Sequence, residues 1–193
     1  MSTDSPPAAL YDLHLHTGWS YDATADLENH FERASALGVR CIAITEHHVL
    51  DSLPEVIETA RSYPEIQTIP AAELTVNTSI GAVDLLCYGF PLDFPPGLKQ
   101  VLDTYHAWQQ NAGEAMCKGM QALGLDYTDA HRLELLQSYR PERVIAVQGT
   151  THVKNGVQQQ YFVERGFIDS ADEYATLRAR AGREVAIPPY PAV

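Results

Sequence analysis

Three short segments of the chain place histidines and carboxylates where they could bind metal ions. His14 and His16 alternate at the end of the first predicted strand, while His47 follows the second strand and Glu73 lies at the end of the third. Because residues two apart on a strand point to the same face, His14 and His16 can address one ion. Asp22 follows shortly after His16, and few Lys or Arg residues stand nearby to neutralise the cluster. Imidazole and carboxylate ligands suit Zn²⁺, Mn²⁺ or Fe²⁺, and the number of these groups predicts two or more ions.

The order of the predicted elements would bring these residues to one place. Short apolar runs predict strands, and apolar positions at helical spacing predict helices between them. The expected strands cover residues 10–16, 41–45, 68–74 and 81–88, and the expected helices cover 27–37 and 53–62. Such alternation predicts an α/β fold with parallel strands joined by helical crossovers, whose functional groups gather at the strands' carboxyl ends.

The second half of the chain has a helical pattern. Helices are expected over residues 98–123, 128–139, 151–165 and 170–181, with Ser170 and Glu173 spaced as a capping box. We expect residues 1–94 to carry the metal motifs, 95–183 to form a helical insertion or subdomain, and 184–193 to begin a return to the first part. The Pro-rich run at 187–193 reads as a connection toward a missing element, which predicts that the chain is C-terminally incomplete.

Composition excludes several classes of partner. The sequence has 193 residues, 45% of them hydrophobic and 20% charged, which is ordinary for a globular domain. Its formal net charge of −12, with no basic run, argues against binding of duplex nucleic acid. A small phosphorylated substrate remains compatible with this acidity, because bound divalent cations reverse the local potential.

Cysteine usage and hydropathy bear on the compartment. Cys41, Cys87 and Cys117 stand singly, so neither a disulfide framework nor a thiolate zinc site is indicated. Residues 1–10 lack the layout of a signal peptide, and no apolar run approaches the ~20 residues that span a bilayer. The expected location is cytoplasmic, with no membrane partner.

The motifs resemble those of a known family. The segments Asp12–Thr17, Ser20–Asp22 and Ile44–His47 are similar to the first two motifs of the PHP (polymerase and histidinol phosphatase) family, and Ala72–Leu74 followed by Val83–Gly89 is similar to the third. Together they cover roughly the first 90 residues. The later segment from Gly149 to Phe167 looks like the insertion of the family's nucleotide and RNA phosphoesterase branch.

This resemblance implies a distorted (βα)7 TIM-like barrel, with a helical insertion in its second half and two to three divalent metal ions (Mn, Zn, Fe or Mg). His14, His16 and Glu73 would hold the first ion, Glu73 would bridge to the second, and Asp22 with His47 would hold the third. Asp84 stands where a histidine ligand of the second ion is usual. A carboxylate is a harder ligand and would favour Mn²⁺ or Mg²⁺.

The implied activity is that of a metal-dependent phosphoesterase acting on a phosphomonoester of a small molecule, such as a nucleotide. The nucleophile would be a metal-activated hydroxide, with no further catalytic side chain. His152 is a candidate substrate-binding residue. The surrounding Gly149–His152 differs from the family's Gly-Arg-Pro-His, and Thr150 cannot replace the charge and the fork of that arginine.

Other departures support an alternative reading. Glu46 replaces the family's Asp before His47, and the family's Ala-His-Pro and Asp-x-His motifs are absent from the sequence. A degenerate or truncated, non-catalytic metal-binding domain is therefore the alternative function. Counting ligands predicts that this chain alone is a weak or inactive phosphatase, because a catalytic metal generally needs three protein ligands. An amidohydrolase-like enzyme is a third reading, against which Thr45–His47 argues.

Structural roles compete with ligation at several positions. Asp22 could instead cap the next helix, and Asp84 could be a solvent-facing strand residue. The remaining histidines are interpreted as surface or packing residues: His30, His48, His106 and His131.

Overall fold

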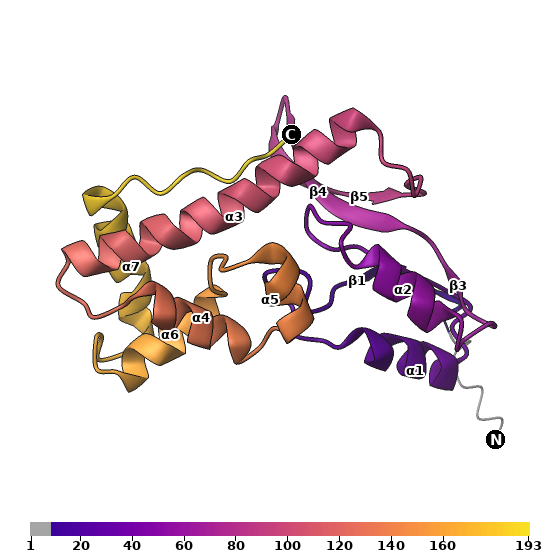
Figure 1. Cartoon of the computed structure of the whole chain (residues 1–193), viewed down its shortest axis with the longest axis horizontal. Coiled ribbons are helices and arrows are strands. Elements are labelled where there is room, and N and C mark those ends of the chain that lie inside the picture. The colour runs from indigo at the N-terminus through magenta and orange to yellow at the C-terminus, as the bar shows by residue number, and fades with distance from the viewer. Residues whose placement is uncertain (1–8) are drawn as a thin grey trace, which may run out of the picture. The chain divides into compact units, whose positions relative to one another are not determined.

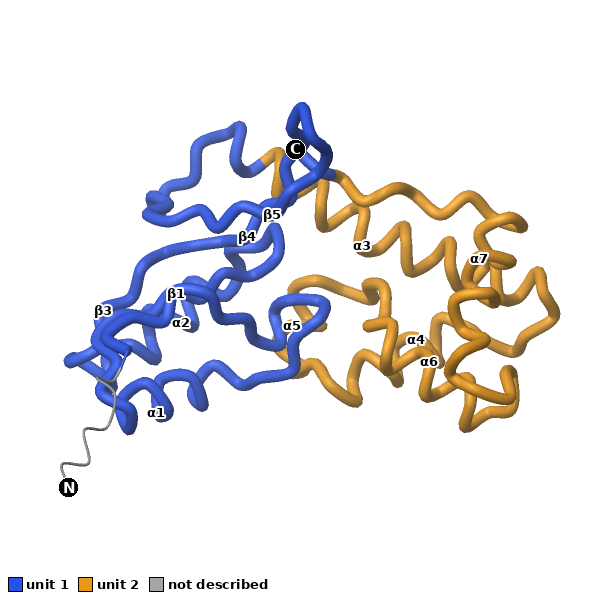
Figure 2. The backbone as a smooth tube through the Cα atoms, turned by 180° about the vertical axis from the view of Figure 1, so that it is seen from behind, with its two compact units in different colours: residues 1–99, 192–193 blue, residues 100–191 orange. Residues whose placement is uncertain are grey.

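The computed structural model describes residues 9–193. The chain divides into two compact units, residues 1–99 with 192–193 and residues 100–191 (Figure 2). The boundaries predicted from the sequence, after residues 94 and 183, rest on composition and stay a prediction. Most of the leader from which a cytoplasmic location was predicted lies outside the described residues.

The first unit contains a small parallel sheet. Its strands β1 (Tyr11–Leu15), β2 (Cys41–Ile44) and β3 (Gln67–Thr68) lie in that order, and both pairs are parallel. The connecting helices are α1 (Leu27–Leu37) and α2 (Leu53–Ala60), as Figure 1 shows. Every residue of β2 is buried, because β2 is the central strand. The predicted βαβαβ order is confirmed for these five elements.

The core of this unit lies between its sheet and its helices. Leu27, Phe31 and Ala34 of α1 recur at helical spacing and pack with Ile42 and Ile44 of β2. The helix ends where predicted, at Gly38, whose left-handed φ of 73° places its N–H toward the last carbonyls of α1.

The last two strands correct the expectation of parallel pairing. Strands β4 (Ala71–Thr78) and β5 (Gly81–Tyr88) form an antiparallel hairpin. Only residues 79 and 80 connect them, and a parallel crossover needs a dozen residues or more. Gly81 closes the turn with a φ of 120°, which favours glycine. The strand predicted over 68–74 is divided, because Ile69 and Pro70 separate β3 from β4.

The α/β class is confirmed, whereas the barrel is not. Over residues 9–193 the strands form one three-stranded and one two-stranded sheet, and they do not close into a barrel. An isolated parallel bridge between His47 and Glu73 joins the end of β2 to β4. The seven-stranded barrel therefore stays an implication of the family resemblance.

Helices make up the second unit. They are α3 (Pro96–Ala122, which begins in the first unit), α4 (Asp129–Gln137), α5 (Glu142–Gln148), α6 (Asn155–Glu164), the short 3₁₀ turn η1 (Ala171–Glu173) and α7 (Tyr174–Glu184). The predicted helical character is confirmed, and α5 is an addition to it. The core contains Met120, Tyr127, Leu136 and Phe162, all fully buried. In the described part of the chain, no helix is both long and apolar enough to cross a bilayer.

Capping differs in detail from the prediction. The Ser170 side chain makes no capping hydrogen bond at η1. A capping box is present instead at α4, where the Thr128 hydroxyl accepts from the His131 N–H and the His131 ring accepts from the Thr128 N–H. His131 was interpreted as a surface or packing residue, and the structure assigns it this cap. Loss of this capping interaction would lower the free energy of unfolding by about 1 kcal/mol.

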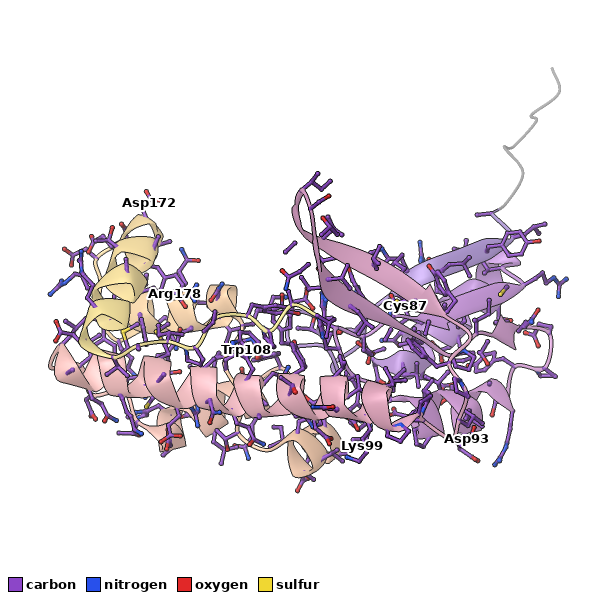
Figure 3. The ribbon with its side chains drawn as sticks, turned by 90° about the horizontal axis from the view of Figure 1, so that it is seen from above. Cys87, Asp93, Lys99, Trp108, Asp172 and Arg178 are labelled. Carbon is purple, nitrogen blue, oxygen red and sulfur yellow. The ribbon has the colours of Figure 1, made fainter. Side chains whose placement is uncertain are left out.

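The extended segment after α7 is attached to α3. The Trp108 indole N–H donates to the Pro188 carbonyl at 3.0 Å, and its ring contacts Tyr190 at a centroid distance of 4.7 Å. Figure 3 labels Trp108 on the long helix. Beyond this segment, the Val193 N–H donates to the Thr75 carbonyl of β4 at 2.9 Å.

Helix α3 comes close to α7 at a glycine. A Cβ atom at Gly119 would lie 2.7 Å from the Ala181 carbonyl oxygen, whereas one at Gly182 would meet only the Ile187 side chain at 3.5 Å. We expect Gly119→Ala to lower the free energy of unfolding by about 1–3 kcal/mol through overpacking. Gly182→Ala, the matched control, should raise it by up to about 1 kcal/mol through helix propensity. Urea denaturation of both variants checks this, and a stabilised Gly119→Ala would contradict it.

Candidate metal centre

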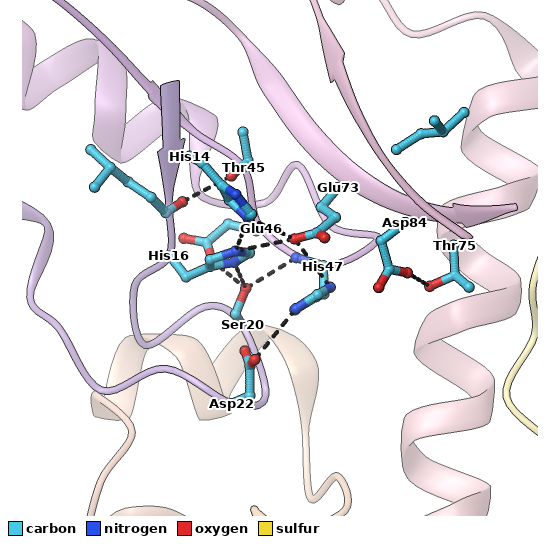
Figure 4. A network of polar contacts seen from close by, with 12 residues as sticks. His14, His16, Ser20, Asp22, Thr45, Glu46, His47, Glu73, Thr75 and Asp84 are labelled. Atoms are coloured by element: carbon cyan, nitrogen blue, oxygen red, sulfur yellow. Dashed lines mark hydrogen bonds and ion pairs between the residues drawn. The ribbon is translucent and has the colours of Figure 1, made fainter. Parts of the chain in front are cut away.

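The first group of ligand atoms comes from β1 and β4. His14 lies on β1 and His16 directly follows that strand, and Glu73 projects from β4 toward both (Figure 4). The two histidine Nε2 atoms are 3.0 Å apart, and each lies 3.1 Å from Oε2 of Glu73. These three residues were predicted as the ligands of one ion, and the structure brings their ligand atoms together.

The shape of this triangle suits a transition metal. Two ligands at right angles, each about 2.1 Å from a metal ion, are about 3.0 Å apart. The nearly equal sides of 3.0–3.1 Å therefore match one face of an octahedron. Two histidines and one carboxylate on such a face are a recurrent set for divalent iron and its neighbours.

A second group shares His16 with the first. His16, Asp22 and His47 offer ligand atoms that all lie within 4.8 Å of one another. The His47 Nε2 atom is 3.4 Å from Oδ2 of Asp22, and the rings of His16 and His47 stack at 4.7 Å. The sequence supplied only Asp22 and His47 for this ion. His16 is the third candidate ligand of this group, and the sequence did not assign it to this ion.

Backbone pairing holds the two strand ends together. The Glu73 N–H donates to the Glu46 carbonyl at 3.0 Å, and the His48 N–H donates to the Glu73 carbonyl at 2.9 Å. His47 lies between these two bonds and opposite Glu73. The two groups are thus fixed by main-chain contacts as well as by side-chain contacts.

In the second group, electrostatics favour a neutral imidazole at His16 and an ionised carboxylate at Asp22. Burial and the nearby His47 lower the pKa of His16, although Asp22 and Glu73 oppose this. Burial by itself would raise the pKa of Asp22, but contact with His47 and the charge of His16 outweigh it and leave that pKa lowered. Burial disfavours charge on His47 too, but Asp22 and Glu73 raise its pKa overall.

A buried network surrounds these ligands. The Glu46 carboxylate is fully buried and accepts from the Ser20 hydroxyl at 2.5 Å and from the Thr17 hydroxyl at 2.6 Å. Burial raises the Glu46 pKa to about 7, against the lowering effect of these hydrogen bonds. Sequence reasoning placed Glu46 only as a substitution beside His47. The hydroxyl residues Thr17 and Ser20, which follow His16 closely in the sequence, were the available indication that a polar network lies beside the ligands.

Two other histidines touch the site, although both were interpreted as surface or packing residues. The His48 side chain is fully buried, and its Nε2 atom accepts from the Thr75 N–H at 2.7 Å. Its backbone has a left-handed φ of 52°, which is uncommon outside glycine. The His30 Nε2 atom lies 2.9 Å from the His16 carbonyl. Their roles could not be read from spacing, since both depend on tertiary contacts.

Two predicted residues stand apart from these groups. Asp84 lies on β5, where its carboxylate accepts from the Thr75 hydroxyl at 2.6 Å. Neither group of ligand atoms found among the described residues includes it. His152 belongs to the second unit, where its ring contacts Trp108. Ligation by Asp84 and substrate binding by His152 stay predictions.

The residues present fit divalent cations. Among the described residues, Oδ1 of Asp22 and Nδ1 of His47 are buried and make no hydrogen bond. Buried polar atoms without hydrogen bonds carry a cost that a coordinated cation would remove. His14, His16 and Glu73 would hold one ion, and His16, Asp22 and His47 would hold a second.

The fold and this site define the class of protein, an α/β protein with a candidate centre for divalent metal ions. The profile of the PHP domain family matches residues 12–183, which is most of the chain. The chain belongs to the PHP domain family. No curated protein shows a significant match.

Two solved structures share the fold. One is an amidohydrolase from Chromobacterium violaceum, with bound sulfate and no metal, at 18% identity and a TM-score of 0.61 over 87% of this chain. The other, from Bifidobacterium adolescentis, carries a provisional designation as a metal-dependent phosphoesterase, and matches 97% of this chain at 18% identity and a TM-score of 0.64. This chain spans 54% and 61% of their respective lengths.

Proposed function

We propose that the protein is a metal-dependent phosphoesterase that hydrolyses a phosphomonoester of a small molecule, such as a nucleotide. The observation that carries the proposal is the pair of overlapping three-ligand groups that meet at His16. Membership of the PHP family and the fold shared with a provisionally designated phosphoesterase support it. The net charge of −12 favours a small substrate over a nucleic-acid duplex.

In the proposed reaction, the residues of the chain would bind the metal ions, and a water molecule would be the nucleophile. The imidazoles of His14, His16 and His47 and the carboxylates of Asp22 and Glu73 would hold divalent cations (Mn²⁺, Zn²⁺, Fe²⁺ or Mg²⁺). Such cations would supply the Lewis acidity that activates water and neutralises phosphate oxygens. Water forms the new bond to phosphorus as the ester P–O bond breaks, and the products are an alcohol and inorganic phosphate.

A metal titration tests the proposal. The EDTA-treated chain should not hydrolyse p-nitrophenyl phosphate, and turnover should appear as Mn²⁺ is added, at the weak level that ligand counting predicts for this chain alone. The diester bis-p-nitrophenyl phosphate should be a poorer substrate, since a phosphomonoesterase site recognises a terminal phosphate. Tight metal binding without turnover of either ester would contradict the proposal and favour the alternative, a non-catalytic metal-binding PHP domain.

A further inference from the structure

We propose that Ser20 and Glu46 act as positioning residues that set the tautomer of His16, so that its Nδ1 atom carries the proton and its Nε2 atom is free to bind a metal ion. The inference rests on the proposed metal centre, and it concerns which nitrogen of His16 carries the proton before a metal ion binds. Neither residue is one of the ligands described above. Both belong to the loops that follow β1 and β2.

The Ser20 hydroxyl lies at the centre of three polar contacts. Its oxygen is 2.5 Å from Oε2 of Glu46 and 3.1 Å from Nδ1 of His16. It also accepts from the backbone N–H of His47 at 3.0 Å. Ser20 and Glu46 are both almost fully buried, at 1% and 0% exposure, so water is not an alternative partner.

The donors and acceptors have one consistent assignment. A hydroxyl has one proton and two acceptor sites, and an ionised carboxylate only accepts. The His47 amide can only donate, so it occupies one acceptor site of Ser20. An ionised Glu46 has no proton to donate, and its oxygens also accept from the N–H and hydroxyl groups of Thr17. Glu46 must therefore accept the Ser20 proton. The remaining acceptor site faces His16, whose Nδ1 atom must therefore donate.

The opposite nitrogen of His16 is the one that faces the other two members of the first ligand group. Its Nε2 atom faces Nε2 of His14 at 3.0 Å and Oε2 of Glu73 at 3.1 Å. The Glu73 carboxylate by itself would favour a proton on that nitrogen. His14 lies 3.1 Å from the same oxygen and can supply the proton instead. A neutral imidazole has a single N–H. Because the Ser20 oxygen accepts that N–H from Nδ1, the Nε2 atom keeps its lone pair.

The consequence for metal binding follows from general coordination chemistry. A histidine that binds a metal through one nitrogen usually donates its other N–H to a fixed acceptor. Loss of that acceptor commonly costs 10–100-fold in metal affinity. Ser20 also holds the His47 backbone, so the same hydroxyl positions one shared ligand and one ligand of the second group.

Nitrogen NMR on the metal-free protein tests the tautomer directly. We would record long-range ¹H–¹⁵N correlations of the ¹⁵N-histidine-labelled chain at pH 8.5, and assign the His16 signals as those that are absent from His16→Ala. Wild type should show a protonated Nδ1 and an unprotonated Nε2. In Glu46→Gln, the amide can donate to Ser20, which frees the Ser20 proton for Nδ1 and moves the imidazole proton to Nε2.

Metal affinity gives the second readout. Glu46→Gln should bind Zn²⁺ 10–100-fold more weakly, while Glu46→Asp, which keeps an acceptor-only group, should retain the wild-type tautomer and most of the affinity. The matched control is Glu65→Gln, because Glu65 accepts from the Ser35 hydroxyl at 2.8 Å on the exposed surface of the same unit. This control should change neither readout.

Several outcomes would overturn the inference. A wild-type His16 with its proton on Nε2 would do so without any variant, as would an unchanged tautomer and affinity in folded Glu46→Gln. If circular dichroism shows that Glu46→Gln is unfolded, Ser20→Ala removes the acceptor by a smaller change and should lose the Nδ1–H preference. No readout depends on turnover, so failure of the phosphoesterase proposal is seen separately.

Discussion

His16→Ala should remove metal from both ligand groups while leaving the metal-free protein folded. His16 is the residue that the two groups share, so its loss leaves each with two ligands. Loss of a supporting contact commonly costs 10–100-fold in metal affinity, and loss of a ligand itself should exceed about 100-fold. The effect on stability without metal should be about 1 kcal/mol, since the imidazole is partly exposed and leaves no sealed cavity.

Two partial variants make this expectation specific. His14→Ala affects only the first group and Asp22→Ala only the second, so each should lose one class of bound ion. Elemental analysis after dialysis against Zn²⁺, together with competition titrations, measures the stoichiometry. His16→Ala should bind the fewest ions and show no metal-dependent turnover. Equal metal content in wild type and His16→Ala would contradict the assignment of His16 to either group.

The contribution of His48 to the stability of the metal-free protein should be lost as the pH falls from about 6.5 to about 4. Burial and the neighbouring His47 lower the His48 pKa from 6.5 to about 4, so the folded state disfavours the charged form. The unfolded chain binds the proton more readily, and stability is therefore fully present above the unfolded pKa and is lost as the pH falls toward the folded pKa. A shift of this size corresponds to about 3 kcal/mol.

The comparison with His48→Gln isolates this contribution. Gln cannot titrate, and its side-chain oxygen can accept from the Thr75 N–H in place of the imidazole. The left-handed backbone at this position is unfavourable for both residues, so it largely cancels in the comparison. Urea denaturation at pH 7.5 and pH 4.5, both with EDTA, should show a smaller loss of stability for the variant. The same pH dependence in both proteins would show that His48 is not the titrating group.

The candidate ligands could be predicted because their signals are local. His14 and His16 alternate on one strand, and the period of a strand places them on one face whatever surrounds it. Alternation of strands and helices then predicts that the end of β2 lies beside the end of β1, which places His47 near them. Gly38 and the run of apolar residues in β2 mark element ends and a central strand by local conformation and composition alone.

The pairing of β4 and β5 was decided by a turn of two residues. Apolar content predicted both strands but carries no information on their direction, and the short connection imposed the antiparallel hairpin. As a result Asp84 lies opposite Thr75 and accepts its hydroxyl proton. The residue count from Glu73 to Asp84 could not reveal that partner.

Only the tertiary structure decided how the ligands are supported. Sequence spacing assigned His16 to one ion, and the approach of His47 to within stacking distance assigned it to two groups. Glu46 and Ser20 belong to different loops, and their contact exists because parallel pairing brings those loops together. The candidate ligands follow from residue type and from the period of the strand, and both can be read from the sequence. Hydrogen-bond partners on different strands and loops depend on how these elements pack in the tertiary structure.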